Sequence, residues 1–454
     1  MAFVGLVNFS LLSTLRTVKS TPTEKCLSVT YISIPQYVAA RTFIKDDTMS
    51  RYFDALETRS GDQRAHDLAV ALPQQIARAK ALPGYAAALA EIDPMTVKNV
   101  AALKNLPVLR KSLLGNAQAN LSPLGGYADL TRAGITHVFQ SPGPVYEPGS
   151  SCNDWFRFGR VLHAAGIGQN DILHNCFSYH LTPAGIMFES GARAVGAKIL
   201  PAGIGQTELQ VRAAVDIGTT AYAGTPDYLK VILDKAEEMG ENLKITRASV
   251  GGGALFPSLR QEYADRGILC LQGYGTADLG SIGYESEAMD GMIIDEGVIV
   301  EIVTPGTGNP VTPGDVGEVV VTTLNPDYPL IRFATGDLSA LLPGQSPCGR
   351  TNIRIRGWMG RADQTAKIKG MFVRPEQVAA LVARHDEVSK ARVVATRDGE
   401  MDVMTVRIES TAGDFGGYGK TVAETLKLKG VVEIVTPGSL PNDGIVIEDQ
   451  RKYE

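Results

Sequence analysis

The sequence predicts an α/β protein, with a large N-terminal α/β domain that includes a small antiparallel β section and a small α+β domain at the C-terminal end. Three observations support this prediction. Short apolar runs alternate with helical ones over residues 171–253, as in βαβ units around a parallel sheet. Two strand-like runs then flank the turn-rich segment "GTGNPVTPGD". Finally, 454 residues exceed the ~250–300 that one hydrophobic core supports.

The N-terminal segment, residues 1–48, is predicted to be an extension or a disordered tail. Its apolar run lacks a basic leader and is shorter than the ~18 residues that span a bilayer. From Met49 onward the sequence has the pattern of amphipathic helices. We therefore expect an N-terminal domain over residues 49–362 and a C-terminal domain over residues 363–454.

The α/β domain is predicted from its alternating runs. The strand-like runs are residues 171–180, 197–203, 220–224 and 247–253, and the helical runs are residues 184–196, 207–218 and 226–240. The antiparallel section follows at residues 297–305 and 316–324. The C-terminal domain has helical runs at residues 375–385 and 419–430, with strands at residues 391–398 and 401–410. No repeat or low-complexity tract interrupts this order.

Charge and cysteine content restrict the partners. The net charge is −5 without clustered Lys or Arg, which argues against nucleic acid and against an anionic membrane as partners. The five cysteines are scattered, without a C-x-x-C motif, so we expect free thiols, a reducing compartment and a cytoplasmic protein. Cys348 alone cannot form a zinc site, because such a site needs about four ligands.

Three segments carry residues suited to a nucleotide. "VGGGALFPS" (residues 250–258) follows a strand and lets a flat ring or a phosphate approach its backbone. "QGYGTADLGS" (residues 272–281) offers Tyr274, Thr276 and Asp278 to stack a base, bind a phosphate and hold magnesium. In "YPLIRFATGDLS" (residues 328–339), Asp337 lies in a turn where its carboxylate can accept two ribose hydroxyls. Each segment alone is most often just a turn, but their order and spacing make them jointly specific.

The stretch from residue 328 to residue 378 resembles the corresponding part of phenylacetate-CoA ligases. These are adenylate-forming enzymes of the acyl-CoA synthetase, peptide synthetase and luciferase superfamily. Its most specific block is "GRADQTAKIKGMFVRPEQV", and "YFDALETRS", "GQTELQV", "GTPDYL" and "QGYGTADLG" extend the resemblance from about Met49 to the C-terminus. The resemblance implies ATP, Mg²⁺ and coenzyme A as cofactors, a small carboxylic acid as substrate, an acyl-adenylate intermediate and a mobile C-terminal lid. A homodimer is also plausible by this resemblance.

The resemblance also implies roles for individual residues. Gly252, Gly253, Tyr274 and Gly275 would hold the adenine nucleotide, and Ser141 and Gly143 would donate to phosphate. Thr276 would contact the α-phosphate, and Asp278 stands where the family has a magnesium-associated glutamate. Asp337 would bind the ribose, and Arg361 the ribose or a phosphate. Asp363 falls at the hinge, and Lys367, Lys369 and Gly370 begin the lid, although the two lysines are equally well explained as solvated surface residues.

The acid is expected to lie against residues 174–185 and 221–229. The candidate contacts are Phe177, Tyr179, His180, Gly224 and Thr225. Because this set is aromatic yet polar, it favours an aryl acid or a small hydroxy acid. A histidine at a strand end is as often a hydrogen-bonded structural residue as a substrate contact.

Two departures from the family pattern concern phosphate. The family's loop reads approximately Ser-Ser-Gly-Thr-Thr-Gly-Lys-Pro, whereas this chain has "SPGPVYEP", with Glu147 in place of the lysine. Such a carboxylate would oppose the β- and γ-phosphates. The family's C-terminal segment resembles "LPRSEGK", but here "LPNDGIVIEDQRKYE" has Ile445 after Gly444. Losing that lysine costs about 10²–10³ in rate, unless Arg451 or Lys452 substitutes.

The sequence therefore leaves three readings open. The first is an AMP-forming acyl-CoA ligase with an unusual phosphate loop, the reading we favour because the hinge and ribose residues persist. The second is an enzyme that performs mainly the thioester-forming half-reaction or another acyl or nucleotidyl transfer. The third is a homologue that binds a nucleotide or an acyl-adenylate without turnover.

Overall fold

The computed structural model describes most of the chain from Ser50 onward. The described ranges are 50–121, 123–141, 144–152, 154–253, 255–364, 366–369, 371–398, 401–412, 417–441 and 445–451. The predicted extension over residues 1–48 lies outside them.

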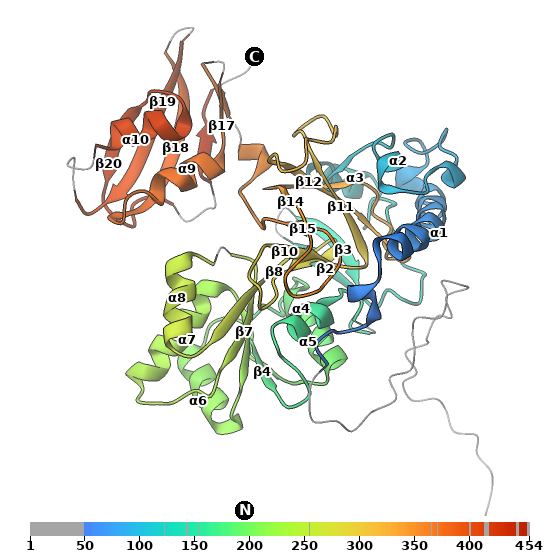
Figure 1. The fold of residues 1–454 in the computed structure, drawn as a ribbon, viewed down its shortest axis with the longest axis horizontal. Helices are drawn as coiled ribbons and strands as arrows, with labels where there is room; N and C mark the ends of the chain where they lie inside the picture. The colour runs from blue at the N-terminus through green and yellow to red at the C-terminus, as the bar shows by residue number, and fades with distance from the viewer. Residues whose placement is uncertain are drawn as a thin grey trace, which may run out of the picture.

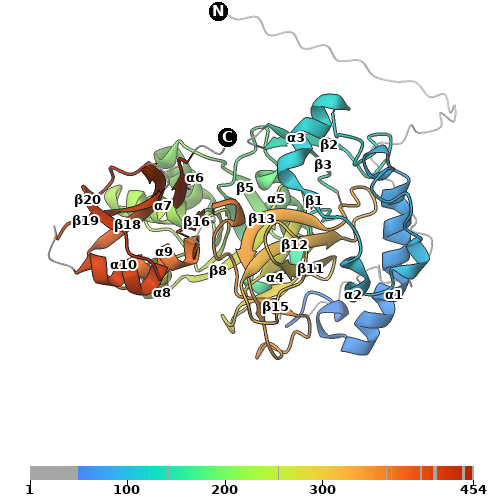
Figure 2. The same cartoon turned by 90° about the horizontal axis from the view of Figure 1, so that it is seen from above.

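The helices among the first described elements lie together on one side of the protein (Figures 1 and 2). The elements are η1 (Ala55–Thr58), α1 (Gly61–Lys80), η2 (Pro83–Tyr85), η3 (Pro94–Thr96), α2 (Val100–Leu103), β1 (Leu109–Arg110) and α3 (Lys111–Asn120). Asp54 and Ser60 cap η1 and α1 by accepting backbone N–H groups, as short polar side chains do at helix starts. Glu57 is buried and accepts hydrogen bonds from the Tyr284 hydroxyl and the Phe53 N–H, which ties this segment to the large sheet.

The predicted α/β body is confirmed. Its strands lie in a nine-stranded sheet of the described chain, in the order β14-β15-β10-β9-β8-β7-β6-β4-β5. The parallel part comprises β4 (Ile172–Asn175), β5 (Lys198–Pro201), β6 (Ala221–Gly224), β7 (Arg247–Val250) and β8 (Leu269–Thr276). The connecting helices are α5 (Ala184–Val195), α6 (Thr207–Ile217), α7 (Pro226–Glu238) and α8 (Pro257–Asp265), which Figure 1 shows packed along the strands.

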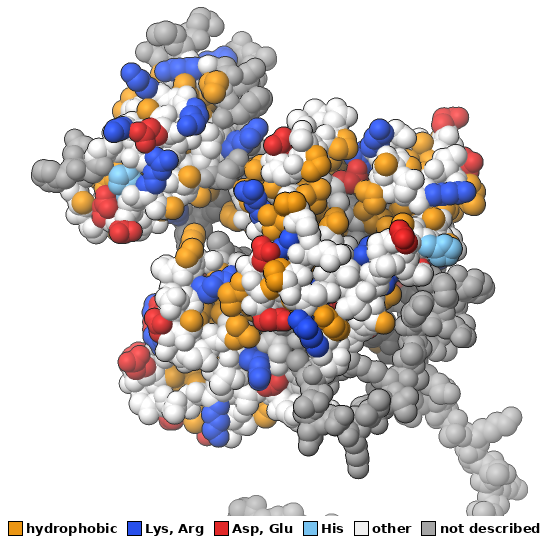
Figure 3. Space-filling model, viewed as in Figure 1, with side chains coloured by type: hydrophobic (Ala, Val, Ile, Leu, Met, Phe, Trp, Pro, Cys, Tyr) orange, Lys and Arg blue, Asp and Glu red, His pale blue; other side chains and the backbone are white. Residues whose placement is uncertain are grey.

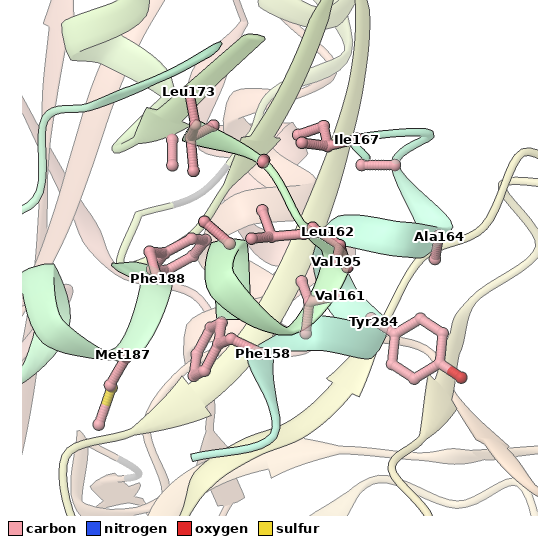
Figure 4. Packing of buried hydrophobic residues seen from close by; sticks show 14 of the residues in the cluster. Phe158, Val161, Leu162, Ala164, Ile167, Leu173, Met187, Phe188, Val195 and Tyr284 are labelled. Atoms are coloured by element: carbon pink, nitrogen blue, oxygen red, sulfur yellow. The ribbon is translucent and has the colours of Figure 1, made fainter. Parts of the chain in front are cut away.

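Apolar side chains from α4 (Phe158–Ala164), α5 and the strands form a core of this body (Figure 4). Leu162 and Leu173 are fully buried, and Phe188 packs close to Phe158. Burying side chains of this size contributes about 1.5–3 kcal/mol each. The core holds the strands in register and therefore positions the loops at their ends.

The antiparallel section is also confirmed. β11 (Val298–Val303) pairs antiparallel with β12 (Gly317–Thr323), and β12 pairs antiparallel with β13 (Phe333–Ser339). β1 completes this four-stranded sheet, parallel to β13. The remaining antiparallel strands extend the large sheet beyond β8 and are β9 (Gly280–Tyr284), β10 (Met292–Ile294), β14 (Leu341–Leu342) and β15 (Arg354–Ile355).

Arg332, just before β13, is 2% exposed and has a left-handed φ of 45°. Its guanidinium group donates to both carboxylate oxygens of Glu301, at 3.0 and 3.1 Å, and to the carbonyl oxygens of Leu106 and Gly308. It thereby joins β11 and β13 to the connection between α2 and β1, so Arg332 has a structural role.

Replacing Arg332 by Met is expected to lower the free energy of unfolding by about 3–5 kcal/mol, because the Glu301 carboxylate would stay buried without its partner. Urea denaturation followed by circular dichroism measures the loss. Arg212→Met is the matched control, since the Arg212–Glu208 pair is exposed and such pairs contribute about 0–1 kcal/mol. A loss below about 1 kcal/mol for Arg332→Met would contradict the assigned role.

The C-terminal segment has a hydrophobic core of its own, as an α+β unit should. Its elements are β16 (Ala366–Ile368), β17 (Met371–Val373), α9 (Pro375–Val382), β18 (Val388–Asp398), β19 (Met401–Ser410), α10 (Tyr418–Leu426), β20 (Val431–Val435) and β21 (Ile447–Asp449). The strands of its main sheet run in the order β20-β19-β18-β21. Figures 1 and 2 both show this segment beside the α/β body, on the side of α8. Its mobility stays a prediction.

Two sequence expectations concern the surface and the cysteines. Figure 3 shows Lys and Arg side chains spread over the visible face among acidic and apolar ones. None of the helices in the described ranges is long and apolar enough to cross a membrane.

Cys176, Cys270 and Cys348 are buried free thiols, but Cys152 is disulfide-bonded, so the prediction of free thiols is wrong at Cys152.

Candidate active site

The carboxyl ends of the parallel strands meet at one edge of the large sheet. Asn175 of β4 pairs with Ala223 of β6, Gly224 pairs with Val250 of β7, and Val250 pairs with Gln272 of β8. This register places the loops after these strands side by side. In open α/β sheets, ligands bind outside the carboxyl ends of the strands.

The glycine-rich segment after β7 lies beside the loops that follow β4 and β6. Gly252 has a φ of 71°, and side-chain atoms of Phe177 and Thr225 lie 3.8 Å from where its Cβ would stand. The exposed Gly253 follows, and Gly224 ends β6 directly before Thr225. The structure thus brings predicted nucleotide residues and predicted acid-contacting residues together.

Asp337 of β13 is the centre of a hydrogen-bonded group. Its Oδ2 accepts from the Tyr274 hydroxyl at 2.8 Å, and its Oδ1 accepts from Trp358 Nε1 and Arg361 Nη1, both at 3.1 Å. Burial, followed by the negative charge of Asp337, raises the pKa of Tyr274 well above its usual value. Since a carboxylate accepts about four hydrogen bonds, Asp337 retains capacity for a further donor such as a ribose hydroxyl.

At two positions in this region, a glycine lets a neighbouring group lie close to its backbone. Gly336 has a φ of 77°, and the place of its absent Cβ is 2.7 Å from the Arg361 guanidinium. At Gly275, a Cβ would stand 2.6 Å from the carbonyl oxygen of Gly280 on the antiparallel partner strand. Larger residues would displace Arg361 or the β8–β9 pairing, so both positions require glycine.

The turn between β8 and β9 presents Thr276 and Asp278. Thr276 Oγ1 accepts a hydrogen bond from the Leu279 N–H at 3.2 Å, which shapes the turn. Asp278 is 2% exposed, and its Oδ2 lies 2.5 Å from Nζ of Lys111, the first residue of α3. Its Oδ1 is buried and has no hydrogen-bond partner in the structure.

The segment that aligns with the phosphate loop is a β-hairpin. β2 (His137–Ser141) pairs antiparallel with β3 (Val145–Gly149), so Ser141 lies opposite Val145. Gln118 of α3 bonds to the backbone N–H and carbonyl of Tyr146, at 2.8 and 2.7 Å, and holds the hairpin against the helix. Gly143 lies outside the described residues.

Glu147, in β3 of this hairpin, is fully buried. Its Oε1 accepts a short hydrogen bond from the Ser141 hydroxyl, and its buried Oε2 has no hydrogen-bond partner in the structure. Burial, with a further contribution from the negative charge of Asp278, raises the pKa of Glu147 to about 7. Burial together with the charges of Asp278 and Glu147 also raises the pKa of Tyr328. The charges of Asp278 and Lys111 therefore both act on Glu147.

The predicted acid-contacting residues differ in exposure. Phe177 is buried and stacks on Phe188, with ring centroids 4.4 Å apart. Tyr179 is half-buried and its hydroxyl accepts from Asn175 Nδ2 at 2.8 Å, whereas His180 is exposed. The Gln140 N–H donates to the Leu181 carbonyl at 2.9 Å, so this loop adjoins the hairpin.

The predicted lid residues lie at the start of the C-terminal segment. Asp363 is in η4 (Ala362–Gln364) and Lys367 is in β16, but the orientations of their side chains are outside the description, as is Gly370. Lys369 is exposed, with a φ of 48°, and its N–H donates to Asp402.

Arg451, one of the two candidates to replace the absent C-terminal lysine, is buried. It forms ion pairs with Asp402 at 3.0 Å and with Asp449 at 2.6 Å. It therefore serves the packing of the C-terminal segment in this conformation. Lys452, the other candidate, is outside the described residues.

Sequence reasoning missed Lys111, Trp358 and Gln118. Lys111 is 167 positions from Asp278, and only the folding of α3 against the β8–β9 turn brings them together. Trp358 lies just before the quoted block, within the stretch from residue 328 to residue 378, and its indole N–H is a donor that a carboxylate such as Asp337 can accept. Nothing in the sequence around Gln118 distinguishes it from a surface residue.

Few of the described side chains are suitable metal ligands. Over the described ranges, no cluster of three or more His, Cys, Asp or Glu residues could hold a metal ion. Cys348 is buried beside Ser346, whose hydroxyl donates to its sulfur at 3.1 Å. A metal at Asp278 would thus need some of its ligands from water or a bound phosphate.

The comparisons with known proteins agree with this geometry. No family model matches the sequence. The chain is 29% identical over 350 residues to a phenylacetate-coenzyme A ligase of Thermus thermophilus, covering 73% of this chain and 78% of the relative. It is 30% identical over 335 residues to the phenylacetate-coenzyme A ligase of Aromatoleum evansii, covering 70% and 74%.

A similar solved structure has the same fold class. The open conformation of a 2-hydroxyisobutyryl-CoA ligase, in complex with 2-HIB-AMP and CoA, superposes with a TM-score of 0.74 at 23% identity. The match covers 89% of this chain and 96% of that chain. The fold is therefore that of the CoA ligases. By its sequence, the chain belongs to the family of phenylacetate-coenzyme A ligases.

Proposed function

We propose that this protein is an AMP-forming acyl-CoA ligase. It activates a small aryl or hydroxy carboxylic acid as an acyl-adenylate and transfers the acyl group to coenzyme A. The observation that carries the proposal is the Tyr274–Asp337–Arg361 group beside the Lys111–Asp278 pair, in a chain of this family. The relatives are named phenylacetate-coenzyme A ligases, and the similar structure contains an acyl-adenylate and CoA.

The nucleoside would bind at the edge formed by β7, β8 and β13. Gly252, Gly253 and Gly275 leave room for the adenine beside Tyr274, and Asp337 accepts the ribose hydroxyls. Arg361 donates to Asp337 and supplies a positive charge near the phosphates. Binding here uses groups that are already oriented, which lowers the cost of ordering them.

The phosphates would extend toward Thr276, Ser141 and Lys111. Lys111 supplies an ammonium group where the aligned loop has none, and stabilises charge that develops on the α-phosphate as the acid carboxylate attacks it. Asp278 would hold Mg²⁺, and its unpartnered buried Oδ1 fits a hard cation. When bound, the ion offsets charge on the phosphate oxygens.

The second half-reaction needs the thiol of coenzyme A to reach the adenylate. The proposed domains, residues 49–362 and 363–454, would reorient about Asp363, and Lys367, Lys369 and Gly370 would then adjoin the pantetheine arm. Closure excludes water that would hydrolyse the adenylate. The protein is proposed to act in the cytoplasm, with a homodimer as its assembly.

One observation favours a second candidate function. Glu147 is fully buried, and it lies in the hairpin that aligns with the family's phosphate loop. A homologue that binds AMP or an acyl-adenylate, or that performs only the thioester-forming step, tolerates this carboxyl group better than an enzyme that binds ATP.

The specificity for the acid is tested at His180, which is exposed next to Tyr179. Replacing His180 by Phe is expected to leave activity on plain aryl acids intact and to lower activity on hydroxy acids, because a hydrogen-bonding partner is lost. Competition between one aryl and one hydroxy acid in a single assay measures the ratio. The opposite shift would remove His180 from the acid site.

Product analysis tests the proposed function itself. The protein is incubated with MgATP, coenzyme A and a panel of aryl, short aliphatic and hydroxy acids, and acyl-CoA is detected by mass spectrometry. Formation of AMP and acyl-CoA with at least one acid is the expected result. AMP or acyl-adenylate binding without any acyl-CoA across the panel would favour the second candidate.

A further inference from the structure

Two buried carboxyl groups of the candidate active site have unused oxygen atoms. Glu147 is 0% exposed, and its Oε2 has no hydrogen-bond partner. Asp278 is 2% exposed, and its Oδ1 likewise has no hydrogen-bond partner. Leaving such atoms unpaired is costly in a protein interior, because each has lost its hydration. They occur on two different elements, the β2–β3 hairpin and the β8–β9 turn.

The cations available here do not balance these carboxyl groups. Lys111 is the ion-pair partner of Asp278, and its positive charge also acts on Glu147, so one ammonium group serves both carboxyl groups. The other described groups that interact with them are the Ser141 hydroxyl and the Tyr328 phenol, which are neutral. The region therefore has room for additional positive charge.

Oxygen atoms from two carboxylates are suitable ligands for a hard divalent cation. Mg²⁺ is usually bound by one or two carboxylates together with substrate phosphates and water, and does not need a cage of protein ligands. The described residues contain no cluster of three or more His, Cys, Asp or Glu ligands, and Mg²⁺ bound in this way does not need one. Glu147 also lies in the hairpin whose tip aligns with a phosphate-binding loop, so a cation there would adjoin the phosphates.

We propose that Glu147 and Asp278 together bind the divalent cation that accompanies ATP. Glu147 of the β2–β3 hairpin and Asp278 of the β8–β9 turn would hold the cation, and each has an unpartnered carboxyl oxygen to offer it. Glu147 then binds the phosphates through the metal, where a lysine would bind them directly. Lys111, relieved of balancing Asp278 alone, turns its charge toward the phosphates. This inference rests on the proposed use of ATP and adds a metal ligand to it.

Binding of Mn²⁺ to the full-length protein tests the inference without relying on catalysis. Free Mn²⁺ is measured by its electron paramagnetic resonance signal, with Mn²⁺ alone and with Mn²⁺ plus α,β-methylene-ATP. Glu147→Gln is expected to weaken Mn²⁺ binding by about 10- to 100-fold, and Asp278→Asn by at least as much. Glu241→Gln, at an exposed position, is the matched control and should bind Mn²⁺ like the unaltered protein.

Circular dichroism checks that the Glu147 variant folds. If Glu147→Gln does not fold, Glu147→Asp retains the carboxylate but retracts it, and the same weakening is expected. Equal Mn²⁺ affinity in the Glu147 variant and the unaltered protein would overturn the inference, as would absence of Mn²⁺ binding to the unaltered protein. Glu147-dependent Mn²⁺ binding in a protein that forms no acyl-CoA would uphold the inference and reject the proposed function.

Discussion

Replacing Lys111 by Met is expected to lower kcat/KM for acid-dependent pyrophosphate release by about 10²- to 10³-fold, the loss typical of removing one group that stabilises transition-state charge. The physical reason is the distribution of charge around the phosphates. The aligned loop contributes Glu147 in place of a cation, and Arg451 is committed to Asp402 and Asp449. Lys111 is thus the ammonium group on which the proposed chemistry depends most strongly.

The matched control for this prediction is Lys98→Met, which removes an exposed lysine that lies shortly before α2. Its kcat/KM should stay within about twofold of the unaltered protein, because an isolated surface charge contributes little. Lys111→Arg should restore part of the activity, since it keeps the charge with a different geometry. Unchanged kcat/KM in Lys111→Met would show that another cation serves the phosphates.

Replacing Asp337 by Asn is expected to weaken ATP and AMP binding by about 10- to 100-fold, since hydrogen bonds to a charged group contribute about 1.5–3 kcal/mol. Asn accepts through a single oxygen and carries no charge, so it cannot serve Tyr274, Trp358, Arg361 and a ribose together. Calorimetric titration with AMP measures the change directly.

The control for Asp337 is Asp315→Asn, in the exposed turn between β11 and β12. It removes the same charge at a distance from the nucleotide site and should leave AMP affinity unchanged. Equal AMP affinity in Asp337→Asn and Asp315→Asn would remove Asp337 from the ribose site. It would also leave the Tyr274–Asp337–Arg361 group with a structural role alone.

Much of the fold is predictable from the sequence because local patterns and burial agree. Apolar runs that alternate with amphipathic helices predict β4 to β8 and their helices, and a turn-rich segment marks the β11–β12 connection. The continuation of the sheet through β9, β10, β15 and β14 is harder to predict. The strands themselves are short, and although β9 pairs with its sequence neighbours β8 and β10, the β10–β15 pairing joins Met292 to Ile355, which lie far apart in the sequence.

The candidate site also contains residues that the sequence predicts and residues that it does not. Tyr274, Asp337 and Arg361 stand out because their motif types and order are recognisable, and the fold brings them into hydrogen-bonding contact. Lys111 does not stand out, since a lysine that begins a helix is ordinary until the tertiary structure places it 2.5 Å from Asp278. Likewise, the sequence shows that Glu147 departs from the family loop but gives no indication that it is buried.

Pyrophosphate release without coenzyme A tests the central claim most directly, because it isolates the adenylation step. The purified protein is given MgATP and the same panel of acids, and pyrophosphate is measured against reactions without acid. Acid-dependent release is the predicted result, and it would mean that the β2–β3 hairpin accommodates ATP despite Glu147. No release with any acid, while AMP still binds, would contradict the claim and indicate a protein that kept the nucleoside site without the adenylation chemistry.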